Sequence, residues 1–146
     1  MVTLVFLALQ KLSSLCRKID DRKSKIPQCT INHEFKYITC ATQIVYCIPL
    51  SCGNTYIGQT GRCLNTWLRE HERSLSTDDG ANLPKHCKKH KCTPLFKKTT
   101  IFGRGKIQSQ GKILEAYHIV KQAYLCVSDT TVTLFDKEIR FLNSLM

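Results

Sequence analysis

The chain has 146 residues, of which 42% are hydrophobic, and it carries a formal net charge of +11 at pH 7. This length fits one domain with a modest hydrophobic core. The apolar run at residues 1–9 is too short to cross a bilayer, which takes about 20 residues, and it lacks the basic start and the cleavage site of a signal peptide. The sequence therefore excludes a transmembrane helix at the N-terminus and argues against secretion.

The first 40 residues are expected to form a segment separate from the domain. Residues 17–25 are highly charged and are followed by Pro27, which predicts a helical or disordered linker. The compact part is expected to be residues 41–146.

Two β-rich runs joined by turn residues predict a hairpin. Residues 43–50 and 54–57 are rich in β-branched and aromatic side chains, and the Ser-Cys-Gly-Asn between them supplies turn chemistry. Because side chains alternate along a strand, Tyr46 and Cys47 face opposite sides of the sheet, and Tyr56 returns on the partner strand. We expect the two phenols to meet.

The remaining elements follow from the spacing of apolar residues. An amphipathic helix is predicted by five residues at helical spacing: Leu64, Trp67, Leu68, His71 and Leu75. Residues 98–102 predict a third strand. Residues 113–124 predict a helix with a buried stripe of Ile113, Tyr117, Val120 and Tyr124. Thr133 with Asp136 is typical of a capping box at the start of a final helix.

Several motifs occur in a specific order. Ile44-Val45-Tyr46 comes first, followed by Ile-Pro-Leu-Ser-Cys-Gly at 48–53 and then by Tyr56-Ile57-Gly58. Two more motifs come after these: Gly-Gln-Thr-Gly-Arg-Cys at 58–63 and Leu-Arg-Glu-His at 68–71. His86-Cys87, residues 113–117 and residues 126–128 continue the series. Over about residues 29–144 this set resembles the GIY-YIG endonucleases, in particular the version carried by Penelope-like retroelements.

The resemblance implies an α+β fold, with a small three-stranded antiparallel sheet flanked by helices and an added Cys/His cluster of the zinc type. It also implies cleavage of DNA phosphodiesters with Mg²⁺ or Mn²⁺. Tyr46 would relay or accept the proton of the attacking water, Tyr56 would support the phosphate or the water, His71 would assist, and Glu115 would ligate the metal.

From the residues alone, blander alternatives stay open. Tyr46 and Tyr56 are also compatible with a cross-strand aromatic pair, and His71 with a helix-surface residue. Glu115 is also compatible with a solvated carboxylate paired with Lys112 or His118.

The sequence departs from the family at two places. The family carries an arginine four residues before the helix histidine, where this chain has Trp67, and losing such a group typically costs factors of about 100 to 1,000 in rate. Arg69 points about 200° away around the helix, and Arg62 precedes the helix. We expect Trp67 to be a packing residue. Gly111 stands where related segments carry charged residues, and it weakens the predicted helix start.

The basic residues indicate a nucleic-acid partner. Residues 81–114 contain no acidic side chain, and a surface of one sign binds polyanions by releasing counterions. The alternative is a solvated loop face. The candidate DNA-binding residues are Arg62, Arg69, Lys85, Lys88, Lys89, Lys97, Lys98, Arg104 and Lys106. In the family this domain follows a reverse transcriptase, so the resemblance implies that this chain is a fragment or an isolated downstream domain. It also implies a nuclear location if the domain is functional, with the reverse transcriptase of a parent element as a possible partner.

The nine cysteines favour metal over disulfides, since the number is odd and histidines are interleaved with them. The candidate zinc ligands are Cys47, Cys52, His86, Cys87, His90 and Cys92. A further group, Cys29, His33 and Cys40, is compatible with the same site or with a second one. Cys63 and Cys126 are expected to be buried, unligated thiols.

Three functional classes follow. The first is a metal-dependent DNA-nicking enzyme impaired by Trp67, and the second is a catalytically silent module that binds zinc and nucleic acid. The third, a secreted cationic cysteine-rich protein, rests on residues 1–9 alone. A count of free thiols separates the third class, because disulfides would leave one reactive thiol at most, whereas a zinc protein releases several on chelation.

Overall fold

A computed structural model of the chain describes residues 29–77 and 81–146, and the expectations for the linker at 17–25 lie outside these residues. The elements follow in the order β1 (Ile44–Pro49), β2 (Thr55–Thr60), α2 (Leu64–Ser74), α3 (Asn82–His90), η1 (Phe96–Lys98), β3 (Thr100–Arg104), α4 (Gln108–Gln122), η2 (Ala123–Leu125) and α5 (Asp136–Leu145). The α+β class with a three-stranded antiparallel sheet is confirmed. No helix in the described part of the chain has the length and apolar character needed to cross a membrane.

The sheet has the order β2-β1-β3, so the motif strand β1 is its central strand. Both neighbours run antiparallel to β1. In the β1–β2 register Tyr46 stands opposite Gly58 and Ile48 stands opposite Tyr56. The two tyrosines therefore share one face of the sheet on a diagonal, as the alternation of side chains requires.

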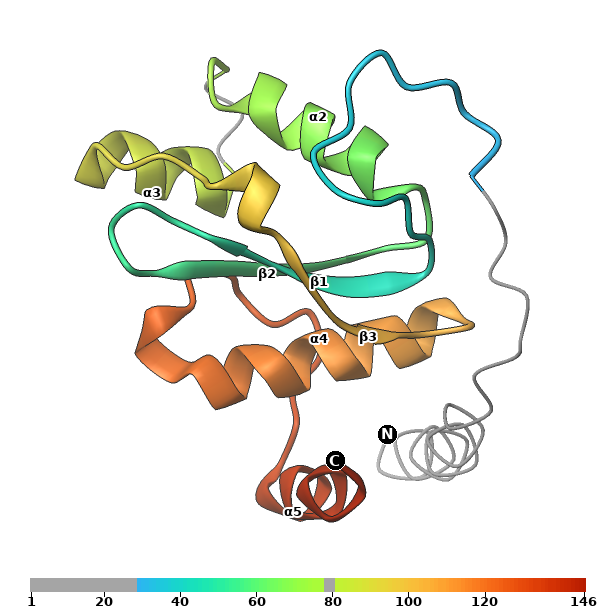
Figure 1. The fold of residues 1–146 in the computed structure, drawn as a ribbon. Helices are drawn as coiled ribbons and strands as arrows, with labels where there is room; N and C mark the ends of the chain where they lie inside the picture. Colours follow the sequence, from blue (N-terminus) through green and yellow to red (C-terminus); the bar gives the residue numbers. More distant parts are fainter. Residues whose placement is uncertain (1–28, 78–80) are drawn as a thin grey trace.

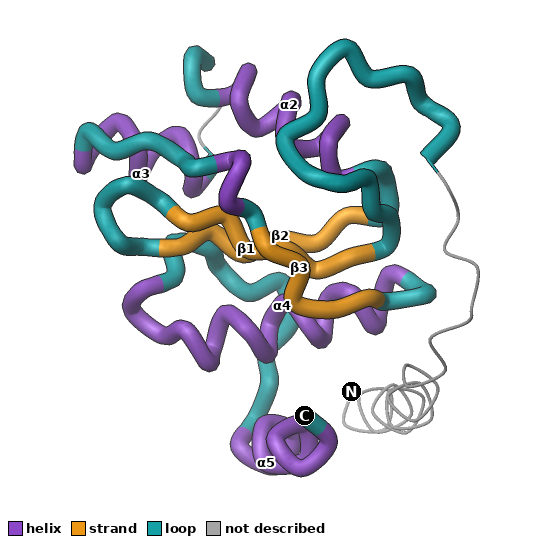
Figure 2. Tube along the Cα trace, in the orientation of Figure 1, coloured by secondary structure: helices purple, strands orange, loops and turns teal. Residues whose placement is uncertain are grey.

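Helices cover both faces of the sheet. Figure 1 shows α2 and α3 on one face and α4 on the other, with α5 beyond α4, and Figure 2 shows the three strands side by side between them. The face toward α2 and α3 buries Ile44, Tyr46 and Ile48. The opposite face buries Val45 and Cys47 against α4. The expected division of the β1 side chains between the two faces is confirmed.

Helix α4 differs from the prediction at both ends. It begins at Gln108 and contains Gly111, which is buried in its first turn. A Cβ at Gly111 would lie 2.9 Å from the Gln59 Oε1 atom, so this glycine lets the helix approach β2 closely. At the other end Val120 is 41% and Tyr124 88% exposed, so the predicted buried stripe was wrong there.

The sequence pattern did not predict helix α3, and it placed the start of helix α5 too early. Helix α3 carries the His86–Cys87 motif and has Pro84 in its first turn, where a missing N–H costs no hydrogen bond. Helix α5 begins at Asp136, and the Glu138 carboxylate accepts a hydrogen bond of 2.6 Å from the Phe135 backbone N–H. The prediction of a capping box that starts at Thr133 was therefore wrong, because the helix is capped at Phe135.

Candidate functional site

Tyr46 lies at the centre of the candidate site, on the central strand and under α2. Its side chain is 1% exposed. The Tyr46 Oη atom lies 2.8 Å from the His71 Nε2 atom, and the indole N–H of Trp67 donates to the same oxygen. Gly58 makes room for the ring, since a Cβ there would lie 2.5 Å from the Tyr46 hydroxyl. The phenol is thus held by hydrogen bonds to two side chains of α2.

Three aromatic side chains of the site lie around the imidazole ring of His71. Its ring centroid lies 5.2 Å from that of Tyr56, 5.3 Å from that of Trp67 and 6.2 Å from that of Tyr46, each in an edge-on arrangement. Trp67 and His71 face the same partners because they stand four residues apart on α2. The two phenols therefore meet at His71, between the sheet and this helix.

Burial keeps these groups uncharged. It raises the pKa of Tyr46 well above its ordinary value, against the opposing effect of the hydrogen bond from Trp67, and it raises the pKa of Tyr56 to about 12. Burial also lowers the pKa of His71 to about 4. His71 is therefore neutral near pH 7. Since the indole N–H can only donate, the Tyr46 hydroxyl is free to donate its proton to the His71 Nε2 atom.

Glu115 is half-buried on α4, and its charge acts on both tyrosines. Burial raises the pKa of this carboxyl to about 7, while Lys112 and a hydrogen bond from the Gln59 backbone lower it. Within the described residues Glu115 forms no salt bridge, so the predicted alternative of a pair with Lys112 or His118 is absent. A half-buried carboxylate outside any salt bridge could be one of the one or two carboxylates through which Mg²⁺ is commonly bound beside waters and phosphate oxygens.

Neither nearby arginine takes the place of the missing helix arginine. Arg62 forms two hydrogen bonds with Glu70, of 2.8 and 2.7 Å, and its guanidinium lies 4.8 Å from the Trp67 ring centroid. Arg69 donates to the Phe35 carbonyl at 3.2 Å, on the far side of α2. Trp67 therefore does more than pack against the core, because its indole N–H donates a hydrogen bond to the Tyr46 hydroxyl oxygen.

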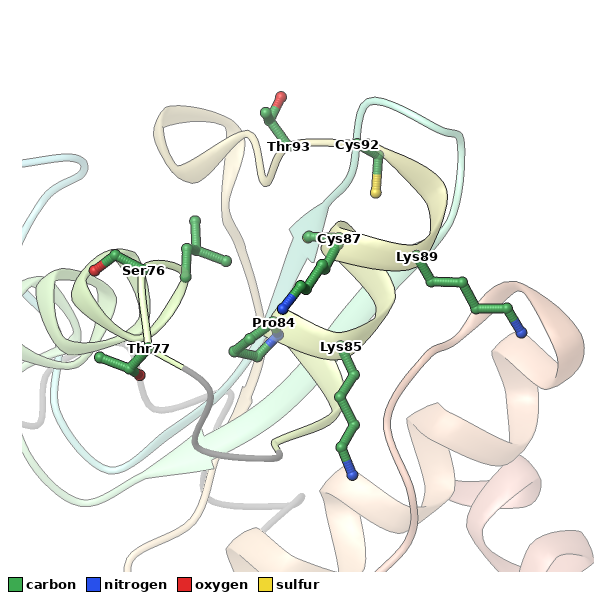
Figure 3. Close-up of a pocket in the computed structure, with 10 residues that line it drawn as sticks. Ser76, Thr77, Pro84, Lys85, Cys87, Lys89, Cys92 and Thr93 are labelled. Atoms are coloured by element: carbon green, nitrogen blue, oxygen red, sulfur yellow. The ribbon is translucent and has the colours of Figure 1, made fainter.

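A Cys/His group lies near the β1–β2 turn and α3. The Cys52 Sγ atom is 3.4 Å from the His86 Nε2 atom, and these two atoms and the Cys92 Sγ atom all lie within 4.8 Å of one another. This group could hold a zinc ion. Cys87 lies beside Cys92, and the two are drawn in Figure 3. Cys47 was a wrong choice of ligand, because it is buried on the opposite face of the sheet.

The histidine at the end of α3 has a different place. His90 is exposed, and its ring centroid lies 4.3 Å from that of His86. It stands beside the group without being one of the three residues that converge. The sequence therefore identified all three converging residues, Cys52, His86 and Cys92. It also proposed Cys47, Cys87 and His90, which do not belong to this group.

A second Cys/His group lies on the N-terminal side of α2. The ligand atoms of Cys29, His33, Cys40 and Cys63 all lie within 4.8 Å of one another. Cys63 is buried, as expected, and its place in this group makes it a candidate ligand that the sequence analysis did not choose. Cys126 lies outside both groups and packs against the core beneath the sheet.

The basic residues are spread over the surface. Eight of the nine candidates are exposed and Arg69 is half-buried. Lys85, Lys88 and Lys89 line a cavity of about 780 Å³ between α3 and the end of α2 (Figure 3). Arg62 and Lys106 line another of about 360 Å³, beside Trp67. Arg62 and Lys106 are therefore the two candidate DNA-binding residues that share a cavity with Trp67.

Comparisons with models of known families, with curated proteins and with solved structures find no match. A function for this chain has to follow from its own residues and their arrangement.

Proposed function

We propose that this chain is a metal-dependent DNA endonuclease domain of retroelement origin that nicks one strand, and that Trp67 impairs it. The observation that carries the proposal is the hydrogen bond between the Tyr46 hydroxyl and a neutral His71, with the Tyr56 ring against the same imidazole. Together with a divalent ion held by the Glu115 carboxylate, a hydroxyl and a neutral imidazole would supply the groups that hydrolysis of a phosphodiester needs.

The hydrogen-bond direction gives a path for the proton of the attacking water. Tyr46 can accept that proton while it passes its own to the His71 Nε2 atom, so no phenolate has to exist beforehand. This matters because burial raises the pKa of Tyr46 well above its ordinary value. Tyr56, kept protonated by its raised pKa, can donate to a phosphate oxygen.

Glu115 would hold the Mg²⁺ or Mn²⁺ ion. When bound, such an ion supplies positive charge to the phosphate and the leaving oxygen. Exposed basic side chains, among them Arg62 and Lys106 in the cavity beside Trp67, would hold the DNA backbone beside the site. The domain would act on DNA in the nucleus, with the reverse transcriptase of a parent element as its protein partner.

Trp67 works against this chemistry in two ways. Its N–H occupies the oxygen that has to receive a proton, and it takes the position from which a guanidinium would neutralise the phosphate. Loss of one charged stabiliser of this kind typically costs about 100- to 1,000-fold in rate. We therefore expect slow nicking.

A second candidate is a catalytically silent module that binds zinc and nucleic acid. It is favoured by the 1% exposure of Tyr46, which leaves its hydroxyl with no path to water in this arrangement. This module would still bind DNA, and its affinity would fall steeply with salt because the contacts are to phosphates.

Nicking of supercoiled plasmid in Mg²⁺ separates the two. We expect slow nicking by the unmodified protein, none after Glu115→Gln, and faster nicking after Trp67→Arg. Glu34→Gln, which changes an exposed carboxylate, is the matched control and should leave the rate unchanged. If none of the proteins nicks while all bind DNA in a salt-dependent way, the silent module is correct and the endonuclease proposal is wrong.

A further inference from the structure

Four metal-binding side chains from distant parts of the chain converge beside α2. The Sγ atoms of Cys29 and Cys63 each lie 3.3 Å from the His33 Nε2 atom, and the Cys40 Sγ atom completes a set within 4.8 Å of one another. In a tetrahedral zinc site with bonds of about 2.0–2.3 Å, the ligand atoms are roughly 3.5–3.8 Å apart. The four side chains are thus already spaced for one ion at their centre.

The donor set matches zinc in number and in kind. Three thiols and one imidazole give a Cys₃His site, which fills all four tetrahedral positions from the protein and is typical of structural zinc. All four residues are half-buried or buried, as suits a site that excludes water. A disulfide would join only two of the thiols and would leave His33 without a role.

The segment that carries three of these ligands is irregular, although Ala41 is buried in the core and Tyr37 and Ile38 pack against it. Residues 29–43 contain no helix or strand, and Figure 1 shows the segment passing beside α2. Its contacts include hydrogen bonds of 2.8 Å from the Tyr37 N–H to the Asn65 side chain and from that side chain to the Ile38 carbonyl. Because irregular backbone gains no ladder of hydrogen bonds, a metal would be its strongest restraint.

Cys63 connects this segment to the catalytic helix. It is the N-cap residue of α2 and makes no capping hydrogen bond with its side chain. A metal bound to the Cys63 thiol would therefore join the irregular segment directly to the first turn of α2.

We propose that Cys29, His33, Cys40 and Cys63 form a closed structural zinc site that fastens residues 29–41 to the start of α2. The site is separate from the group at Cys52, which brings three ligands together rather than four. It also serves the tyrosine site indirectly, since α2 carries both Trp67 and His71. The proposal does not depend on nuclease activity.

The test measures zinc in full-length protein from which the other group has been removed. A Cys52→Ser, Cys92→Ser double variant should retain about one zinc ion per chain by mass spectrometry of the metal. Adding Cys29→Ser should remove it, while adding Cys126→Ser, a half-buried thiol outside both groups, should not. Amide hydrogen exchange at Tyr37 and Ile38 should speed up in the Cys29→Ser protein, with β1 unchanged.

A gain-of-signal variant guards against simple unfolding. His33→Cys in the same background should still bind one metal ion, and the intensity of thiolate-to-cobalt charge transfer in the Co²⁺ form should rise by about one third, from three thiolates to four. The proposal is overturned if the background variant holds no metal, or if Cys29→Ser retains as much metal as Cys126→Ser. An unchanged cobalt spectrum in the His33→Cys protein would remove His33 from the site and overturn the Cys₃His assignment.

Discussion

Gly58 faces the Tyr46 ring across the β1–β2 pair, and this makes Gly58→Ala a sharp test of the site's geometry. The added Cβ would lie 2.5 Å from the Tyr46 hydroxyl oxygen, 2.7 Å from Cζ and 3.3 Å from Cε1. Ordinary contacts begin at about 3.5 Å, so the ring would have to move by on the order of 1 Å. The ring is 1% exposed, so that movement would displace packed neighbours.

The cost can be built up from two effects. Overpacking a tight site costs about 1–3 kcal/mol. Moving the hydroxyl also weakens its hydrogen bonds to His71 and Trp67, at roughly 1 kcal/mol each. Replacing a strand glycine returns about 0.5–1 kcal/mol of backbone entropy. We therefore expect a net loss of about 2–4 kcal/mol in the free energy of unfolding.

Urea unfolding followed by circular dichroism measures this loss. With a typical urea m-value of 1–3 kcal/mol/M, the midpoint should fall by roughly 1–2 M. Gly61→Ala is the matched control, because a Cβ there has nothing within 4 Å, and it should be neutral or slightly stabilising. Equal midpoints for the two variants would refute the close approach of Gly58 and Tyr46. In a Tyr46→Phe background, which lacks the hydroxyl and both of its hydrogen bonds, Gly58→Ala should cost about 2 kcal/mol less.

Three further outcomes follow from the structure. Burial lowers the pKa of His71 to about 4, below about 6.5 in the unfolded chain, so the unfolded state binds more protons between these values. The contribution of His71 to the free energy of unfolding should therefore be fully present above about pH 6.5 and fall as the pH drops toward 4, by at most on the order of 3 kcal/mol. In urea unfolding measured over a series of pH values, His71→Gln should flatten this part of the curve. Asn65→Ala should cost about 2–4 kcal/mol by thermal unfolding, because it leaves the Tyr37 N–H and the Ile38 carbonyl without their partner; a loss below 1 kcal/mol would contradict this. Tyr117→Phe removes a 2.7 Å hydrogen bond to α5 and should cost about 1 kcal/mol, seen as faster amide exchange in α5 while β1 stays protected.

The parts of the fold that depend on near neighbours could be predicted from the sequence. The hairpin strands and the helix from Leu64 follow from spacing within a dozen residues, and the structure places α2 at Leu64–Ser74. The division of Tyr46 and Cys47 between the two faces follows from the same alternation. That alternation already made Cys47 a poor partner for Cys52.

The start of α4 and the whole of α3 were harder to predict. Gly111 counts against a helix by its propensity, yet its lack of a side chain is what lets the helix meet Gln59. Helix α3 is short and mostly polar, with Leu83, Pro84 and Cys87 as its buried residues, so its periodicity is weak. Packing against the rest of the molecule overrides local preference in both cases.

By itself, the sequence determined which residues can share a face: Tyr46 with Ile48, and Trp67 with His71. These relations are set by the repeat of a strand or a helix over a few residues. Only the tertiary structure decided that the Trp67 N–H caps the Tyr46 hydroxyl, that Glu115 acts on both tyrosines and that Cys63 meets Cys29. Each of those contacts depends on how a helix crosses the sheet or where an irregular segment folds back, and no local repeat encodes such long-range geometry.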